Sequence, residues 1–303
     1  MSAVVMTVAA RTPTGRRMQL AVLLRRLREQ ARLTQGDAGR SVWPSSSAAS
    51  VQNKIARLES GDAGIKLEDL RSLLAVYGVQ DAAVTDLALQ LQSGLSQRGR
   101  WTGFRAVHDD ATRRYIDLEE DATLIRLVAA EVVPEILQSP SYLRAEHPAT
   151  RADAPELQAK LARQRTVLLR PDPAQFYAVL SESCVRRTQG DDAVLREQVA
   201  HLISLSRRPH ITIQLVPFRP RGPVRPIART GLLERFALLR LTTPEVPGKL
   251  PEHLDYAFTK SGADLTFSDH VRHYETLWTE ATAAALTPAE TRAFLTTVLN
   301  ELD

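Results

Sequence analysis

Residues 20–78 contain a series of short amphipathic helices separated by turn signals, and this series restricts the fold more than any other part of the chain. The first helix carries leucines at helical spacing: Leu20, Leu23, Leu24 and Leu27. Thr34 opens a second helix, with Asp37 in the place of an acidic capping partner. A leucine-rich helix at 67–77 and another at 81–95 follow. Short helices of this kind bury their leucines only against one another, so the sequence predicts an all-α domain over residues 19–96.

The segment after Pro44 predicts a helix with one apolar and one polar face. Ser50 is a suitable N-cap, and at about 100° per residue the next three apolar residues share one face: Val51, Ile55 and Leu58. Polar residues project from the opposite face or its flanks: Gln52, Asn53, Lys54 and Arg57. Asn and Gln can bond adenine, Arg can bond guanine, and Lys suits phosphate. Together with Ser50, these are the side chains expected to contact DNA from a helix that enters the major groove, although an ordinary polar helix face gives the same pattern.

The distribution of charge supports a nucleic-acid-facing surface near the start of the chain. Residues 1–60 hold ten lysines and arginines against three acidic residues, whereas the whole chain has a net charge of only +4. Neutralisation of phosphates supplies most non-specific affinity for DNA, so a basic end on a balanced protein fits this role. The alternative is a positively charged tail on a solvated helix.

The order of these segments resembles the lambda repressor/Cro-like (XRE-type) helix-turn-helix. The resemblance rests on the sequence at 24–29, on Leu33-Thr34-Gln35 and on the sequence at 54–61. In that family a glutamine at the start of the second helix commonly binds a phosphate, which implies this role for Gln35. Two departures stand out: the loop before the third helix reads about six residues longer than usual, and Gly36 and Gly39 lie inside the second helix. An interior glycine costs about 1 kcal/mol relative to alanine; Gly39 could permit a close helix crossing, whereas Gly36 offers no evident benefit.

A second resemblance begins at Trp101 and extends through most of the remaining chain. It rests on the order of several motifs: residues 118–122 (Leu-Glu-Glu-Asp-Ala), 133–138 (Val-Pro-Glu-Ile-Leu-Gln), 142–145 (Tyr-Leu-Arg-Ala) and 213–218 (Ile-Gln-Leu-Val-Pro-Phe). These motifs are similar to actinobacterial regulators that join a helix-turn-helix to a C-terminal domain of uncharacterised function. An acidic residue usual in the family after the tyrosine of a late strand is missing around Tyr256, so ligand chemistry does not transfer from the family.

The pattern of the second part predicts an α/β (α+β) domain over 97–303, after a flexible basic arm at 1–18. Helices are expected at about 114–132, 154–169, 191–206, 268–286 and 288–302, the last with Thr287 as N-cap, Pro288 at N1 and Glu290 at N3. Strands are expected at 175–181, 211–217, 234–242 and 253–259. The chain is therefore predicted to have two domains, one all-α and one mixed.

Motifs of catalysis are absent from the sequence. It contains no glycine-rich nucleotide loop, no His-Glu-x-x-His and no Gly-x-Ser-x-Gly. Cys184 is more easily explained as a small buried residue at a strand end than as a thiolate. His270 and His273 could share a metal with Glu275, but exposed helix histidines are the simpler interpretation. We therefore expect no catalytic residue, no cofactor and no bound metal.

No apolar run reaches the 18–20 residues or so that span a bilayer, and residues 1–18 lack the apolar region of a signal peptide. A cytoplasmic, nucleoid-associated protein without a membrane partner is therefore expected. Aromatic residues such as Trp278 are interpreted as core or interface residues, with pocket lining as the alternative.

The sequence as a whole favours a transcription regulator that binds double-stranded DNA as a homodimer. Its C-terminal domain would mediate dimerisation and sense a small molecule or a partner protein. The main alternative is an antitoxin-like interaction module that binds a small partner protein encoded nearby. An enzyme with a fused DNA-binding domain is a third class, for which the sequence offers no motif.

Overall fold

The computed structural model describes residues 10–93, 109–146, 155–187, 190–219, 235–244, 250, 252–261, 264–268 and 271–302. The chain divides into two compact units. The first comprises Met1–Thr102 together with Leu241–Leu254, and the second comprises Gly103–Arg240 together with Asp255–Asp303. Each unit is described by itself.

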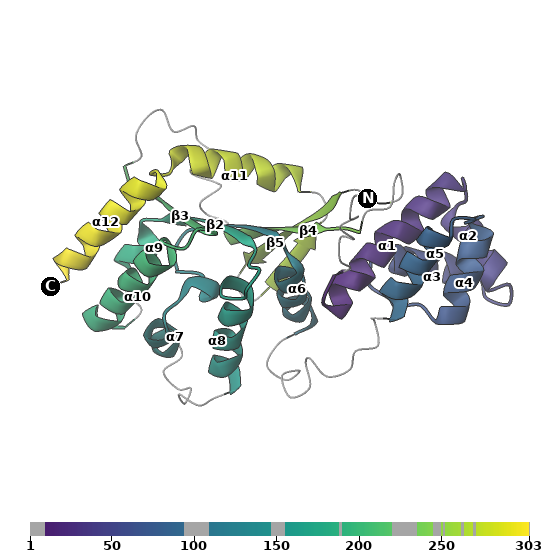
Figure 1. The fold of residues 1–303 in the computed structure, drawn as a ribbon, viewed down its shortest axis with the longest axis horizontal. Helices are drawn as coiled ribbons and strands as arrows, with labels where there is room; N and C mark the ends of the chain where they lie inside the picture. Colours follow the sequence, from purple (N-terminus) through teal and green to yellow (C-terminus); the bar gives the residue numbers. More distant parts are fainter. Residues whose placement is uncertain are drawn as a thin grey trace, which may run out of the picture. The chain divides into compact units, whose positions relative to one another are not determined.

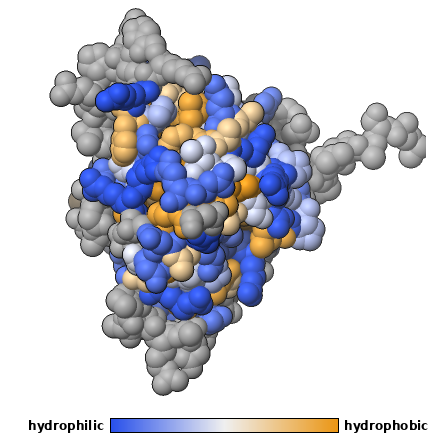
Figure 2. Space-filling model, turned by 90° about the vertical axis from the view of Figure 1, so that its left-hand side faces the viewer, coloured by the Kyte–Doolittle hydropathy of each residue, from blue (hydrophilic) through white to orange (hydrophobic). Residues whose placement is uncertain are grey.

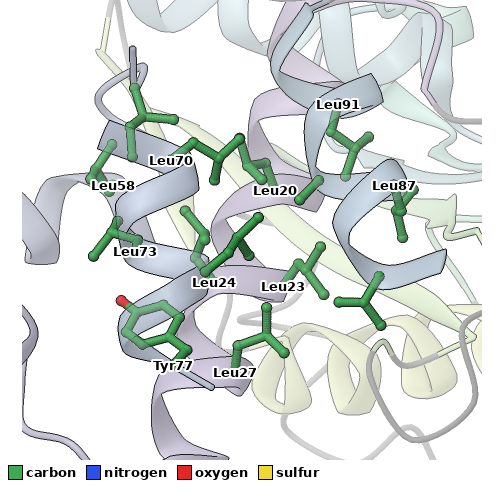
Figure 3. Packing of buried hydrophobic residues seen from close by; sticks show 14 of the residues in the cluster. Leu20, Leu23, Leu24, Leu27, Leu58, Leu70, Leu73, Tyr77, Leu87 and Leu91 are labelled. Atoms are coloured by element: carbon green, nitrogen blue, oxygen red, sulfur yellow. The ribbon is translucent and has the colours of Figure 1, made fainter. Parts of the chain in front are cut away.

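The described part of the first unit contains five α-helices, as the sequence predicts. They are α1 (Pro13–Gln30), α2 (Gln35–Val42), α3 (Ala48–Glu59), α4 (Leu67–Val76) and α5 (Ala82–Ser93). Their apolar stripes meet in one core, in which leucines of α1 lie against α3, α4 and α5 (Figure 3). Leu23, Leu70, Leu73 and Leu91 are completely buried. Burying one such side chain contributes roughly 1.5–3 kcal/mol, so this core holds the helices in a fixed arrangement.

Helix α1 begins earlier than the sequence predicts, and residues 13–18 are therefore helical rather than part of a flexible arm. The Thr12 side chain accepts a hydrogen bond from the backbone N–H of Gly15 at 3.0 Å, and Pro13 occupies the first turn. A threonine N-cap followed by proline is a helix start signal. The basic, small-residue composition of this stretch hid that signal. Residues 1–9 lie outside the described residues.

The second unit is built on a six-stranded sheet of order β3-β2-β1-β4-β5-β6, of which only the last two residues of β4 and the first two of β5 fall within the segment grouped with the first unit. The strands are β1 (Leu124–Ala129), β2 (Gln175–Ser181), β3 (Ile211–Val216), β4 (Arg235–Thr242), β5 (His253–Ser261) and β6 (Asp264–Ser268). Strands β1, β2 and β3 are parallel, β4 runs antiparallel to β1, and β6 runs antiparallel to β5. The unit is therefore a mixed α/β domain, and the predicted two-domain fold class is confirmed.

Helices cover both faces of this sheet (Figure 1). Helix α11 (Arg272–Ala284) lies on one face. On the other face lie α6 (Asp110–Asp121), α8 (Pro155–Leu168) and α10 (Asp192–Leu205). The shorter elements are η2 (Glu135–Leu137), α7 (Pro140–Glu146) and α9 (Ser183–Arg186).

Helix α12 (Pro288–Glu301) begins with the predicted capping box between Thr287 and Glu290. Its Thr291 hydroxyl accepts a hydrogen bond from the backbone N–H of Leu215, and the N–H of Leu286 donates to the Leu215 carbonyl. The outer edge of β3 is thereby closed near its C-terminal end, which hinders pairing with another strand there.

The helix predicted at 114–132 is wrong in its second half. Helix α6 ends at Asp121, and the following residues form β1 at the centre of the sheet. A central parallel strand is buried on both faces, so it reads as a continuous apolar run without alternation. In sequence, the Leu-Ile-Arg-Leu-Val run after α6 therefore resembles a continuation of the helix. Strand β6 was also missed, whereas the other four strands lie where the sequence predicts them.

A buried ion pair joins α6 to α8. The Arg163 guanidinium donates two hydrogen bonds to the fully buried carboxylate of Glu119, at 2.6 and 2.9 Å, and the Tyr115 hydroxyl donates a third at 2.9 Å. Glu119 belongs to the Leu-Glu-Glu motif of the second resemblance, and here it is a structural residue.

Candidate nucleic-acid interface

The packing of α2 against α3 depends on Gly39. A Cβ atom at this position would lie 2.8 Å from Val51 Cβ and 3.0 Å from the Val51 carbonyl oxygen. Such distances are too short for any side chain, so the close crossing predicted from Gly39 is confirmed. At Gly36 an added Cβ would approach only the Thr34 hydroxyl, at 3.8 Å. Gly36 therefore has no steric role, also as expected.

The turn between the two helices is shorter than the sequence suggests. Helix α2 ends at Val42 and α3 begins at Ala48, so the turn occupies residues 43–47. The N-cap is Ser47, whose side chain accepts a hydrogen bond from the N–H of Ser50 at 3.3 Å. The prediction of Ser50 as N-cap is wrong: Ser50 lies in the first turn and is exposed. The serine run offers several possible caps, and the two alanines before Ser50 extend the helix toward its N-terminus.

The predicted polarity of α3 is confirmed. Val51, Ile55 and Leu58 are buried on its inner face. Of the residues predicted to contact DNA, Gln35 is half-buried, and the others are exposed to solvent: Ser50, Gln52, Asn53, Lys54 and Arg57. The structure thus presents their side chains on one accessible surface, and contact with bases stays a prediction.

The C-terminal end of α3 is fixed by a buried ion pair with α1. Arg28 Nε and one terminal nitrogen donate to the two Glu59 oxygens at 2.6 and 2.9 Å, and the other terminal nitrogen donates to the Leu33 carbonyl at 2.8 Å. The Arg28 and Glu59 side chains are 12% and 4% exposed. The hydrogen bond to Glu59 raises the pKa of Arg28, so its guanidinium remains charged. A bidentate pair of this kind fixes the orientation as well as the distance of the two helices.

Gln35 extends this pair to α2. Its amide nitrogen donates to Glu59 Oε2 at 2.9 Å, so Glu59 receives hydrogen bonds from side chains of both α1 and α2. The implied phosphate contact would have to use the second N–H of the same amide. Sequence reasoning missed this anchor, although a signal exists: Arg28 follows Leu24, and Glu59 follows Ile55, by four residues. Both charged residues therefore continue a buried stripe, where an unpaired charge would be costly.

Trp43 fixes the turn and was also missed. Its indole N–H donates to Asp69 Oδ1 on α4 at 3.0 Å, and the Lys54 ammonium lies 3.7 Å from the centre of its ring. The cation–π contact restricts the Lys54 side chain to the side of α3 next to the turn. Any contact of Lys54 with a phosphate would therefore be made by a side chain that Trp43 already restricts.

The candidate reactive residues of the second unit are Cys184 and the histidines near the start of α11. Cys184 is completely buried, as predicted, and burial raises the pKa of its thiol to about 12, so it is not a thiolate at neutral pH. His270 lies outside the described residues. Within the described ranges no three His, Cys, Asp or Glu side chains form a metal-binding group. Likewise, no helix in the described part of the chain is long and apolar enough to cross a membrane.

Comparison with known families identifies both units. Residues 19–87, which hold most of the five helices, match the family described as "Helix-turn-helix domain". The chain is thus a helix-turn-helix DNA-binding regulator. Residues 112–297, more than half of the chain, match "Domain of unknown function (DUF5753)", and the chain belongs to that family. Searches of curated proteins and of solved structures found no match.

Proposed function

We propose that this protein is a sequence-specific transcription regulator of the XRE type that reads double-stranded DNA with α3. The proposal rests on the exposed polar residues of α3, a helix whose buried side is held by α1 and α2. These residues are Gln52, Asn53, Lys54 and Arg57. Their donors and acceptors match base edges and phosphates. The Arg28–Glu59–Gln35 contacts hold α3 against α1 and α2, so its polar face is presented in one orientation.

A two-fold dimer would place two copies of α3 in successive major grooves about 34 Å apart. The operator is then a pseudo-palindrome. We assign dimerisation to the second unit because it is much larger than a simple dimerisation arm requires, and we place the protein in the cytoplasm on the nucleoid.

The second unit in this proposal receives a signal and performs no catalysis. A signal alters DNA affinity only to the extent that it binds the DNA-competent and incompetent states differently. In a helix-turn-helix dimer, a change in the separation of the two DNA-binding domains spoils the half-site spacing. The signal is a small molecule or a partner protein.

Substitutions on α3 test the proposal. Arg57→Ala and Asn53→Ala should each weaken binding to the operator by about 1–3 kcal/mol while weakening non-specific DNA less. Lys54→Ala should weaken all sequences alike and reduce the dependence of affinity on salt. The control is Arg187→Ala in the second unit, since Arg187 is 71% exposed and, among the described residues, pairs with the exposed Glu131. If both Arg57→Ala and Asn53→Ala bind the operator as tightly as the wild type, α3 does not read it through these residues.

A further inference from the structure

Three polar residues form a row across the centre of the sheet, on the face that α11 covers. Arg126 of β1 pairs in register with Tyr177 of β2, and Tyr177 pairs with Thr212 of β3. All three are half-buried. The next residues along β1 and β2 on this face, Val128 and Val179, belong to the apolar core under α11. The polar row therefore borders the apolar core instead of lying on a fully solvated surface.

Arg126 is a buried cation with too few partners. Its side chain is only 16% exposed, yet among the described residues it makes a single hydrogen bond, from one terminal nitrogen to Glu275 Oε1 at 3.5 Å. Its Nε–H is buried and has no partner. A guanidinium carries five N–H donors, and unmade hydrogen bonds of a buried charged group are costly. Such a group favours a further hydrogen-bond partner, which the described part of the chain does not supply.

The surroundings of Arg126 show what kind of partner fits. On the same sheet face the Arg240 guanidinium is neutralised by Asp255, with two hydrogen bonds of 2.7 and 2.8 Å, so it offers no comparable charge. The hydroxyls of Tyr177 and Thr212 make no hydrogen bond within the described part of the chain. The Trp278 ring on α11 lies 5.9 Å from the Arg126 guanidinium. The row thus offers one cation, two hydroxyls and an aromatic surface.

We propose that this row binds a small organic oxyanion, with its carboxylate or phosphate on Arg126 and its body along Tyr177 and Thr212. The planar fork of a guanidinium matches both groups with two parallel hydrogen bonds. Strands lie about 4.8 Å apart, so three residues in register span roughly 10 Å, the size of a metabolite. Glu275, 42% exposed on α11, competes with the ligand for Arg126, and the oxyanion displaces it.

A hydrophobic surface that docks a partner protein has less support in this unit than the anion site. The large hydrophobic residues exposed in its described part are Leu169 and Phe218. On the α12 end of the molecule, hydrophobic and hydrophilic residues are interspersed (Figure 2). Reception of a small anion is therefore the mode of signalling that the described side chains favour. This role as a signal rests on the proposed function, whereas binding of the anion does not.

Calorimetric titration of the full-length protein tests the site. The probes are inorganic phosphate, citrate and adenosine monophosphate, in chloride buffer at constant ionic strength. We expect saturable binding of at least one probe. Binding of phosphate or adenosine monophosphate indicates a phosphate ligand, and binding of citrate indicates a carboxylate ligand. Arg126→Gln should weaken this binding by about tenfold or more. Glu275→Gln should tighten it, because the competing carboxylate is gone; a purely structural role of Arg126 predicts no such gain. Arg187→Gln is the matched control and should bind as the wild type does.

The proposal is overturned if the wild type shows no saturable binding of any probe. It is equally overturned if a cooperatively folded Arg126→Gln binds as tightly as the wild type, or if Glu275→Gln does not tighten binding. Titration of the same variants with operator DNA, in the absence of oxyanion, keeps the two proposals apart. Arg126→Gln should bind DNA normally there, so failure of the anion site leaves DNA reading intact.

Discussion

The two units differ in how many hydrogen bonds they provide to a largely buried arginine. In the helix-turn-helix unit, Arg28 makes three hydrogen bonds of 2.6 to 2.9 Å, two of them to the carboxylate of Glu59. In the sheet unit, Arg126 is comparably buried but makes one hydrogen bond of 3.5 Å. The hydrogen-bonding capacity of Arg28 is largely used by its neighbours, whereas that of Arg126 is mostly unused among the residues that the structure describes.

The difference matches two roles: Arg28 positions a helix, whereas Arg126 is proposed to bind an anion. A bidentate, fully bonded pair has one low-energy geometry, which suits a helix that must present its polar face to DNA in a fixed orientation. A buried guanidinium with unmade hydrogen bonds is costly in the free protein and gains most from an added anion. Loss of a partner of Arg28 should therefore lower the free energy of unfolding, whereas loss of the Arg126 charge should not.

Glu59→Gln should have the largest effect. It leaves the buried Arg28 charge without a carboxylate, and removing one partner of a buried pair costs about 3–5 kcal/mol. Urea unfolding of the helix-turn-helix unit, followed in the full-length protein, measures this loss. The control is Arg25→Gln, because it removes the exposed Arg25–Glu29 pair, which should contribute less than about 1 kcal/mol, and leaves the partners of Arg28 in place. Equal losses in the two variants would contradict the anchoring role of Glu59.

Gly39→Ala should have a smaller effect, because it overpacks the crossing of α2 and α3. The added methyl group would lie 2.8 Å from Val51 Cβ, and such overpacking costs about 1–3 kcal/mol. Gly36→Ala in the same helix meets no close atom and should stabilise the unit by up to about 1 kcal/mol. Thermal unfolding of the two variants should therefore shift in opposite directions. A shift of the same sign would show that the crossing is not limited by Gly39.

Arg126→Gln should have the smallest effect on stability in buffer without oxyanions. It removes a costly charge together with one long hydrogen bond, so the free energy of unfolding should change by less than about 0.5 kcal/mol or rise. Arg163→Gln is the comparison within the same unit: it leaves the buried Glu119 carboxylate unpaired and should cost about 3–5 kcal/mol. A loss for Arg126→Gln as large as for Arg163→Gln would mean that Arg126 is already satisfied.

Local signals in the sequence predict the helix-turn-helix unit well. Its helices carry leucine stripes at 3.6-residue spacing, and the Thr34 cap lies where a cap is expected. The inner face of α3 follows from Val51, Ile55 and Leu58 alone. Errors arise where several residues compete for one role, as in the serine run, in which Ser47 and not Ser50 is the N-cap.

Features that depend on distant partners could not be predicted from sequence in the same way. The pairing of Arg28 with Glu59 and the contact of Trp43 with Asp69 join residues on different helices, and no local pattern identifies the partner. Strand β1 lacks alternation because both of its faces are buried. The row of Arg126, Tyr177 and Thr212 exists only through the register of three strands far apart in the sequence.

The central claim, that this protein reads specific DNA through a basic helix-turn-helix, is tested most directly by mapping its binding sites. Genome-wide immunoprecipitation of the protein should enrich a small set of sites that share a pseudo-palindromic sequence, including one near its own promoter. Purified protein should bind such a duplex with an affinity that falls steeply as salt rises, because bound phosphates release counterions. The absence of enriched sites, together with binding in vitro that does not respond to salt, would contradict the claim.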